Sequence, residues 1–239
     1  MTYNEIIECL HDLADPEVVL LKEKRFGIVA QNSLGIYHKE LKLIAKEIGH
    51  EPGLALQLFD SGIYEARLLC SKLLRPKNVT EDLAEKWIKV FDNWEICDSF
   101  CMGLVAKSKY AYTKIMEWSE RTPEFEKRAA FATMAAFCMA DKKADNEVFE
   151  QFFPIILREA NDDRHFVKKA VNWALRSIGK RNIDLRRQAI EVAGDLLEFE
   201  NRAAKWIAKD ALAELQKEGV RMSDYPRGVY RPVRRQIDD

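Results

Sequence analysis

The chain has 239 residues, of which 47% are hydrophobic and 32% charged, and its formal net charge is −1 at pH 7. This composition excludes an intrinsically disordered chain, which carries fewer apolar residues and a larger charge imbalance. No apolar run approaches the roughly 18 residues that a membrane span requires, and the first residues lack the apolar segment of a signal peptide. We therefore expect a soluble, cytoplasmic protein with no membrane contact.

Apolar residues recur at helical spacing through almost the whole chain, and no segment alternates as a strand would. The first helix is expected at 3–13. Asp15 is suited to cap a second helix, and Pro16 is suited to be its first residue. This helix is expected to end near Phe26, and a loop is expected at 30–36. Further helices are predicted at 37–48, 53–74, 80–91, 94–107, 109–120, 124–140, 146–160, 164–180, 183–198 and 201–218.

The short connections between these helices predict that neighbours pack antiparallel. Many such pairs indicate an all-α solenoid of HEAT type, whose repeating unit has roughly 40 residues. We assign 1–220 to one helical-repeat domain and 221–239 to a basic C-terminal tail. Because internal sequence identity between repeats is weak, a compact non-repeating bundle is the alternative. A solenoid would bring side chains of successive helices together on one concave face.

Five cysteines at irregular spacing indicate reduced thiols in a chain too large to need disulfides. Cys97 and Cys101 lie one helical turn apart, a spacing that suits two metal ligands. Since no second pair lies nearby, a buried apolar role is favoured and no metal is expected. The cysteines are Cys9, Cys70, Cys97, Cys101 and Cys138.

Positive charge is concentrated in the C-terminal half. Between Arg164 and Arg187, eight Lys or Arg residues accompany a single acid, Asp184. This distribution on a near-neutral chain favours a localised anionic partner, and solvated helix faces are the alternative. The tail adds Arg221, Arg227, Arg231, Arg234 and Arg235.

Two short segments suggest a site in the middle of the chain. Trp94 and Asp98 are four residues apart and share a helix face. Arg128 opens an otherwise small and apolar helical segment, where its guanidinium is suited to pair with a phosphate or with Asp98. The alternatives are core packing for the tryptophan, a cap or surface charge for the aspartate, and a helix-boundary charge for the arginine.

A third segment lies in the basic region. Trp173, Arg176 and Lys180 fall on one helical stripe. An aromatic ring and two cations along one face form a suitable surface for a DNA backbone. A core tryptophan flanked by solvated cations is the alternative.

The order W-x-x-x-D, R-A-A and K-A-x-x-W-x-L-R resembles the AlkD-type family of DNA alkylation repair glycosylases, over roughly residues 20–200. The resemblance implies HEAT-like repeats around a DNA-facing groove. By position it makes Asp98 the catalytic carboxylate, Arg128 the arginine beside it, and Trp94 and Trp173 the groove-lining tryptophans. The resemblance also implies that Arg176 and Lys180 contact the DNA backbone. It further implies that the turn 33–36 leads into a helix start that faces DNA, where Tyr37 and His38 lie.

The same resemblance implies hydrolysis of the N-glycosidic bond of cationic N-alkylated purines, such as 3-methyladenine and 7-methylguanine, without a base-flipping pocket. Bond cleavage builds positive charge on the deoxyribose, and a carboxylate near C1′ stabilises that charge. Aromatic faces also favour cations. The expected partner is alkylated double-stranded DNA, bound by a monomer without a cofactor.

Three departures from the family pattern bear on this assignment. Ala136 stands where members often carry a basic residue, Tyr37 and His38 where small polar residues are common, and Glu95 where aspartate is frequent. The first two are expected to weaken or redirect DNA binding. A non-catalytic protein that binds unusual DNA structures is therefore the runner-up. A scaffold for protein partners is less favoured, because 164–187 is basic.

Overall fold

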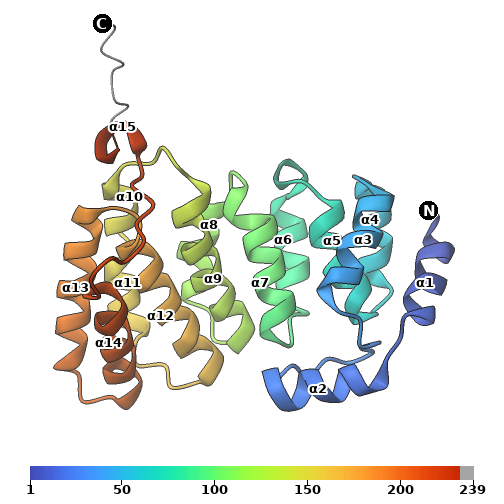
Figure 1. Ribbon diagram of the computed structural model, residues 1–239, viewed down its shortest axis with the longest axis horizontal. Coiled ribbons are helices and arrows are strands. Elements are labelled where there is room, and N and C mark those ends of the chain that lie inside the picture. The colour runs from blue at the N-terminus through green and yellow to red at the C-terminus, as the bar shows by residue number, and fades with distance from the viewer. Residues whose placement is uncertain (232–239) are drawn as a thin grey trace, which may run out of the picture. The chain divides into compact units, whose positions relative to one another are not determined.

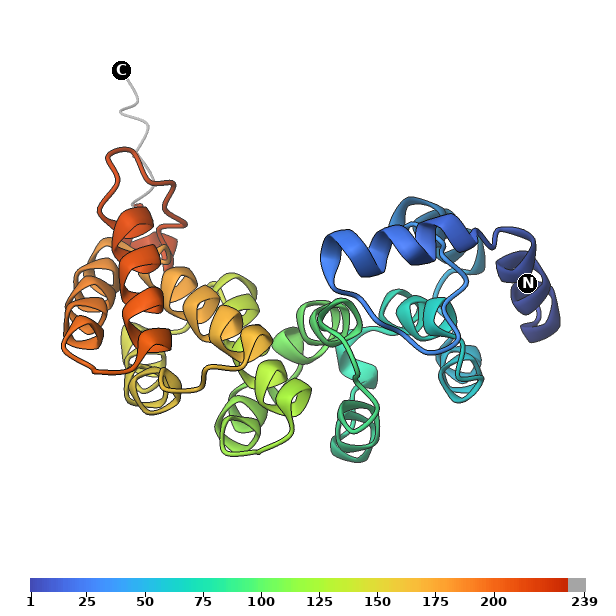
Figure 2. The ribbon, with the colours of Figure 1, turned by 90° about the horizontal axis from the view of Figure 1, so that it is seen from below.

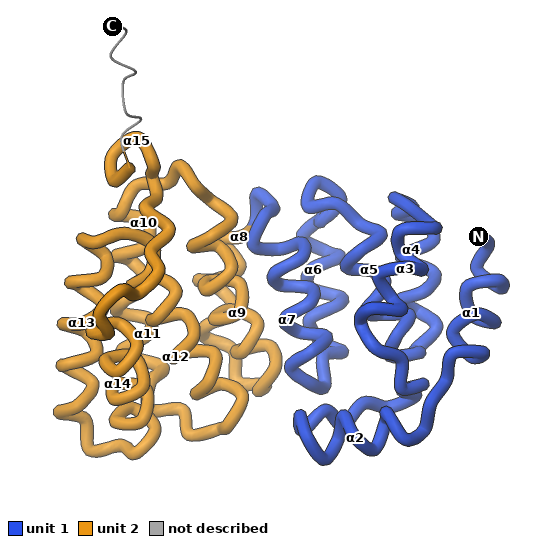
Figure 3. The backbone as a smooth tube through the Cα atoms, viewed as in Figure 1, with its two compact units in different colours: residues 1–110 blue, residues 111–239 orange. Residues whose placement is uncertain are grey.

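The structure is a computed structural model that describes residues 1–231, and helices and loops account for all of this range, with no strand (Figure 1). The chain divides into two compact units, Met1–Tyr110 and Ala111–Asp239 (Figure 3). The last eight residues of the predicted basic tail, 232–239, lie outside the described residues. In the described part of the chain no helix is both long and apolar enough to cross a membrane.

Unit 1 is built from short helices around an aromatic and aliphatic core. Helix α5 packs against α3, α4 and α7. Trp87 stacks on Phe59 with ring centroids 4.0 Å apart, and both rings are buried. The elements of this unit are α1 (Tyr3–Asp12), α2 (Pro16–Phe26), α3 (His38–Ile48), α4 (Pro52–Asp60), α5 (Tyr64–Leu73), η1 (Pro76–Asn78), α6 (Glu81–Ile88), α7 (Trp94–Gly103) and η2 (Val105–Lys107).

Helix α2 runs crosswise to α3, α5 and α7 in both ribbon views (Figures 1 and 2). It begins where the sequence predicted, at Pro16, and the Asp15 side chain caps it by accepting hydrogen bonds from the backbone N–H groups of Glu17 and Val18. Its buried residues are only Val18 and Lys22. A helix that buries so little apolar surface depends on other anchors. The polar contacts described below supply them.

Unit 2 has longer helices that pack closely. Helix α9 packs against α8 and α12, and α14 packs against α12 and α13. Four buried alanines let the neighbours approach α9: Ala129, Ala130, Ala132 and Ala135. The elements are α8 (Ala111–Ser119), α9 (Glu124–Ala140), α10 (Asn146–Glu150), α11 (Phe153–Glu159), α12 (His165–Gly179), α13 (Ile183–Leu197), α14 (Arg202–Leu215) and α15 (Arg227–Tyr230).

Several of the expected helices are shorter than predicted, and two of them are divided. The helix expected at 53–74 is two helices, α4 and α5, because Gly62 adopts a left-handed φ of 75° between them. The helix expected at 146–160 divides into α10 and α11, and Pro154 lies in the first turn of α11, where its missing N–H costs nothing. The helix expected at 94–107 ends at Gly103. Cys97 and Cys101 are fully buried in α7, in agreement with their favoured apolar role.

Candidate functional site

Helix α7 carries Trp94 at its first position and Asp98 one turn later. The Asn93 side chain caps the helix by accepting from the N–H groups of Glu95 and Ile96, at 3.0 and 3.2 Å. Trp94 and Asp98 are half-buried, whereas Ile96 between them is buried. The helix therefore presents an indole and a carboxylate on one partly exposed stripe of unit 1.

The Trp94 indole is held in place by α2. Its Nε1 donates to the carbonyl oxygen of Phe26, the last residue of α2, at 2.9 Å. A buried or half-buried tryptophan usually satisfies its N–H in this way. The contact fixes the edge of the ring, so the orientation of Trp94 depends on the position of α2.

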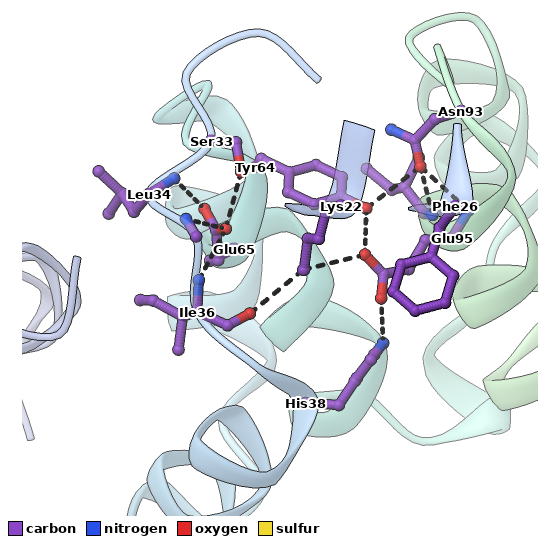
Figure 4. Close-up of polar contacts among 12 residues, drawn as sticks. Lys22, Phe26, Ser33, Leu34, Ile36, His38, Tyr64, Glu65, Asn93 and Glu95 are labelled. Carbon is purple, nitrogen blue, oxygen red and sulfur yellow. Dashed lines mark hydrogen bonds and ion pairs between the residues drawn. The ribbon is translucent and has the colours of Figure 1, made fainter. Parts of the chain in front are cut away.

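Glu95, the residue after Trp94, is buried and is the centre of a polar network (Figure 4). Its carboxylate accepts from Lys22 Nζ at 3.2 Å and from the Tyr64 hydroxyl at 2.6 Å, and His38 Nε2 lies 2.9 Å away. Burial alone would raise the pKa of Glu95, but the hydrogen bonds from His38 and Tyr64 and the charge of Lys22 outweigh it and lower the pKa to about 2. Glu95 is therefore ionised at neutral pH.

A second buried carboxylate, Glu65 on α5, organises the turn 33–36 (Figure 4). It accepts from three consecutive backbone N–H groups, those of residues 34, 35 and 36, at 2.8, 2.9 and 3.3 Å, and from the Ser33 hydroxyl at 3.0 Å. Gly35 has a φ of 80°, and a Cβ there would lie 2.0 Å from the Asp15 carbonyl oxygen, so glycine alone fits. Lys22 Nζ also donates to the Ile36 carbonyl oxygen at 3.2 Å.

These two carboxylates fix the start of α3, where Tyr37 and His38 lie. Tyr37 is 42% exposed, and no side chain caps α3 at this end. His38 is directed toward Glu95 (Figure 4). Two departures from the family pattern, His38 and Glu95, are thus contact partners. Consequently Glu95 supports one of the residues that the sequence assigned to DNA binding.

In unit 2, Arg128 on α9 reaches the start of α12. Its side chain is buried, and Nη1 donates to the Phe166 carbonyl oxygen at 2.7 Å. The neighbouring His165 has a lowered pKa, caused first by burial and then by the charges of Lys169 and Lys168, with a further contribution from Arg128. The Glu124 carboxylate accepts from the Phe166 N–H at 3.3 Å. The first turn of α12 therefore has an anionic partner beside these cations.

Trp173, Arg176 and Lys180 follow on α12, and the two cations are paired rather than solvated. Both donate to Glu214 on α14, Lys180 at 2.5 Å, and Arg176 Nε also lies 3.5 Å from Asp210. Burial alone would raise the pKa of Glu214, but hydrogen bonds from Lys180 and Arg176 lower it. Trp173 is half-buried on the same helix. A phosphate at this stripe would compete with the Glu214 carboxylate.

Sequence reasoning missed the residues that support the unit 1 site, namely Lys22, Tyr64 and Glu65. The sequence did contain a signal for two of them, because Lys22 and Glu65 are charged residues at inward-facing positions of amphipathic helices. Ala136, the third departure from the family pattern, is half-buried on α9. Within residues 1–231, no cluster of three or more His, Cys, Asp or Glu side chains is arranged to hold a metal ion.

Comparison with protein families matches residues 6–215 to the family described as DNA alkylation repair enzyme. A solved structure with 17% identity and a TM-score of 0.73 covers 93% of this chain and 98% of its own. It is described as "a new family of proteins related to the HEAT-like repeat DNA glycosylases with affinity for branched DNA structures". This likeness confirms the predicted all-α, HEAT-like repeat fold.

Two further solved structures resemble the chain more distantly. One is an engineered protein with 14% identity and a TM-score of 0.37, covering 74% of this chain and 91% of its own. The other is a designed armadillo repeat protein in complex with the peptide (KR)4, with 13% identity, a TM-score of 0.36 and 72% coverage of each chain. Comparison with curated proteins found no match.

Proposed function

The chain belongs to the DNA alkylation repair enzyme family, and from this premise we propose that it excises cationic N-alkylated purines from duplex DNA. The observation that carries the proposal is the α7 stripe. Trp94 and Asp98 lie one turn apart, both are partly exposed, and the indole is fixed through Phe26. A fixed aromatic face beside a carboxylate suits a reaction that develops positive charge on a sugar.

The proposed reaction is hydrolysis of the bond between C1′ and the base nitrogen. The electron pair of this bond leaves with the base and neutralises its positive charge, while the deoxyribose becomes cationic. The Asp98 carboxylate stabilises this charge and orients a water molecule, whose oxygen forms the new bond to C1′ and whose proton passes to the carboxylate or to solvent. The face of Trp94 attracts the cationic base or sugar.

We assign DNA backbone contacts to residues of each unit. In unit 1, Tyr37 and His38 lie at the uncapped start of α3, where backbone N–H groups favour a phosphate. In unit 2, Arg128, Lys168 and Lys169 provide positive charge near the start of α12. Trp173, Arg176 and Lys180 extend the proposed contact along α12. Alkylated duplex DNA is the proposed partner, and no cofactor takes part in the reaction.

The pairing of Arg176 with Glu214 makes the phosphate contact testable. Arg176→Ala should weaken binding to all DNA sequences and reduce the slope of log affinity against log salt by about one. Glu214→Gln should raise affinity, because it removes the charge that neutralises Arg176 and Lys180. Fluorescence anisotropy at several salt concentrations measures both effects. Arg202→Ala, an exposed arginine at the start of α14, is the matched control. An unchanged slope in Arg176→Ala would exclude this contact.

A second candidate function is binding of unusual DNA structures without catalysis. The solved structure of similar fold is described as having affinity for branched DNA. Ala136, where a basic residue is expected from the family pattern, also favours this candidate. It predicts preference for forked or four-way DNA over a plain duplex of the same length.

A base-release assay separates the two functions. Duplex DNA methylated with a simple alkylating agent is incubated with the wild-type protein, and free bases are separated chromatographically. The proposed function predicts release of 7-methylguanine or 3-methyladenine above the spontaneous rate. DNA binding without any release would favour the second candidate, and absence of binding to every form of DNA would overturn both.

A further inference from the structure

The C-terminal segment, residues 220–231, is docked against the helices of unit 2. The Ser223 N–H donates to the Lys180 carbonyl oxygen at 2.9 Å, and the Tyr225 N–H donates to that of Arg181 at 3.1 Å. The Asn182 side chain in turn donates to the Tyr225 carbonyl oxygen at 2.7 Å. The described part of the predicted basic tail is therefore attached to the end of α12 by backbone hydrogen bonds.

Arg181 forms the platform beneath this segment. It is fully buried, and its guanidinium donates to the carbonyl oxygens of Cys138 and Asp141, each at 2.6 Å, and of Ala144 at 2.8 Å. The same guanidinium lies 5.7 Å from the ring centroid of Tyr225. These contacts fix the position of Tyr225, which is 6% exposed. The segment thus has a defined position over the ends of α9 and α12.

A cavity of about 730 Å³ lies between the C-terminal segment and the ends of α9, α12 and α14. Among residues 1–231, Glu214 is the one carboxylate in its lining, which also contains four cationic side chains: Lys180, Arg221, Arg227 and Arg231. Glu214 already accepts hydrogen bonds from Lys180 and Arg176. Asp224 lies 3.8 Å from Arg231, so it offsets part of that charge. The cavity retains an excess of positive charge.

A smaller cavity of about 360 Å³ adjoins the same segment. Lys142 and Lys143 line it together with Arg227, which borders both cavities. Lys142 and Arg227 lie 5.8 and 5.3 Å from the Tyr225 ring centroid. Lys142 and Arg227 therefore lie close to one fixed aromatic residue, and clustered lysines and arginines attract phosphate groups.

We propose that this basic cavity binds phosphate groups of a nucleic-acid strand, as a DNA contact additional to the α12 stripe. The inference rests on the proposed function in taking DNA as the partner. Lys180 belongs both to the stripe and to the cavity lining, so a strand that follows α12 leads directly to it. The arginines provide planar, multidentate donors for phosphate, and Met139 provides an apolar wall for a sugar or base.

The test uses the full-length double variant Arg221→Ala, Arg227→Ala. Both arginines are exposed, so their loss leaves the Arg181 platform intact. With a fluorescent duplex oligonucleotide, the variant should bind at least about 10-fold more weakly at low salt, with a salt slope reduced by about 1.8. Arg202→Ala is the control, because Arg202 lies 12 positions before Glu214 in α14, about 18 Å along the helix. The single variant Arg221→Glu should weaken binding without touching Tyr225.

The outcomes distinguish this inference from the proposed function. Wild-type binding to DNA with an unchanged affinity and slope in the double variant would overturn the cavity site alone. Failure of the wild-type protein to bind any DNA would overturn the proposed function and this inference together. A deoxynucleoside monophosphate that binds wild type but not the double variant, while oligonucleotide binding is equal in both, would assign the cavity to free nucleotides and overturn the strand contact.

Discussion

Asp98→Asn should lower the rate of 7-methylguanine release by about 10²–10³-fold, the effect typical of losing one preorganised electrostatic group. The substitution keeps the shape and most hydrogen-bonding capacity of the side chain but removes its negative charge. DNA affinity should stay constant or rise slightly, because an anion is removed from the surface that is proposed to bind phosphates. Single-turnover release from methylated duplex DNA measures the effect, and anisotropy measures the affinity.

A thermal unfolding curve must accompany this assay. Asp98 is only half-buried, so the variant should unfold near the wild-type temperature. Asp82→Asn, an exposed carboxylate on α6, is the matched control and should release base at the wild-type rate. A clear loss of stability in Asp98→Asn would make Asp98 a structural residue. If wild type and variant bind methylated DNA but are equally inactive, the protein is a non-catalytic DNA-binding module.

The sequence predicted the helical architecture well because its local signals are strong. The Asp15 side chain caps α2 as expected, and Thr80 and Asn182 cap α6 and α13, which begin within one residue of their predicted starts. The long helices α9 and α12 end within one residue of expectation. The breaks inside 53–74 and 146–160 were missed because apolar residues continue at helical spacing on both sides of each break. Only the local turn at Gly62 and the interruption before Pro154 separate the paired helices.

The local geometry of the candidate site was predictable where its residues are neighbours in the sequence. The four-residue spacing of Trp94 and Asp98 revealed their shared face of α7. Lys22 and Glu95, by contrast, are 73 residues apart, and no local pattern links them. The pairing of Arg176 with Glu214 across 38 residues was missed for the same reason. Long-range ion pairs therefore determine how rigid the unit 1 site is and how available the α12 cations are.

Lys22 connects the site to the stability of unit 1. It is buried on α2 and contacts both Glu95 and the Ile36 carbonyl oxygen (Figure 4). Since α2 buries little else, Lys22 and the Phe26–Trp94 hydrogen bond are its main tertiary anchors described above. Loss of Lys22 would remove the ammonium group that pairs with the buried Glu95 carboxylate. It would also weaken the attachment of α2, the helix that orients Trp94.

Lys22→Met should therefore lower the free energy of unfolding by about 3 kcal/mol at pH 7, the usual cost of removing one partner of a buried ion pair. Lys24→Met, at an exposed lysine of the same helix, should change it little. The pKa of Glu95 is lowered from 4.5 to about 2, so its contribution to stability is present above pH 4.5 and is lost as the pH falls toward 2. The difference between wild type and Lys22→Met, measured by urea unfolding, should shrink over this interval. A difference that stays constant from pH 7 to pH 2.5 would show that Lys22 stabilises the fold by packing rather than through Glu95.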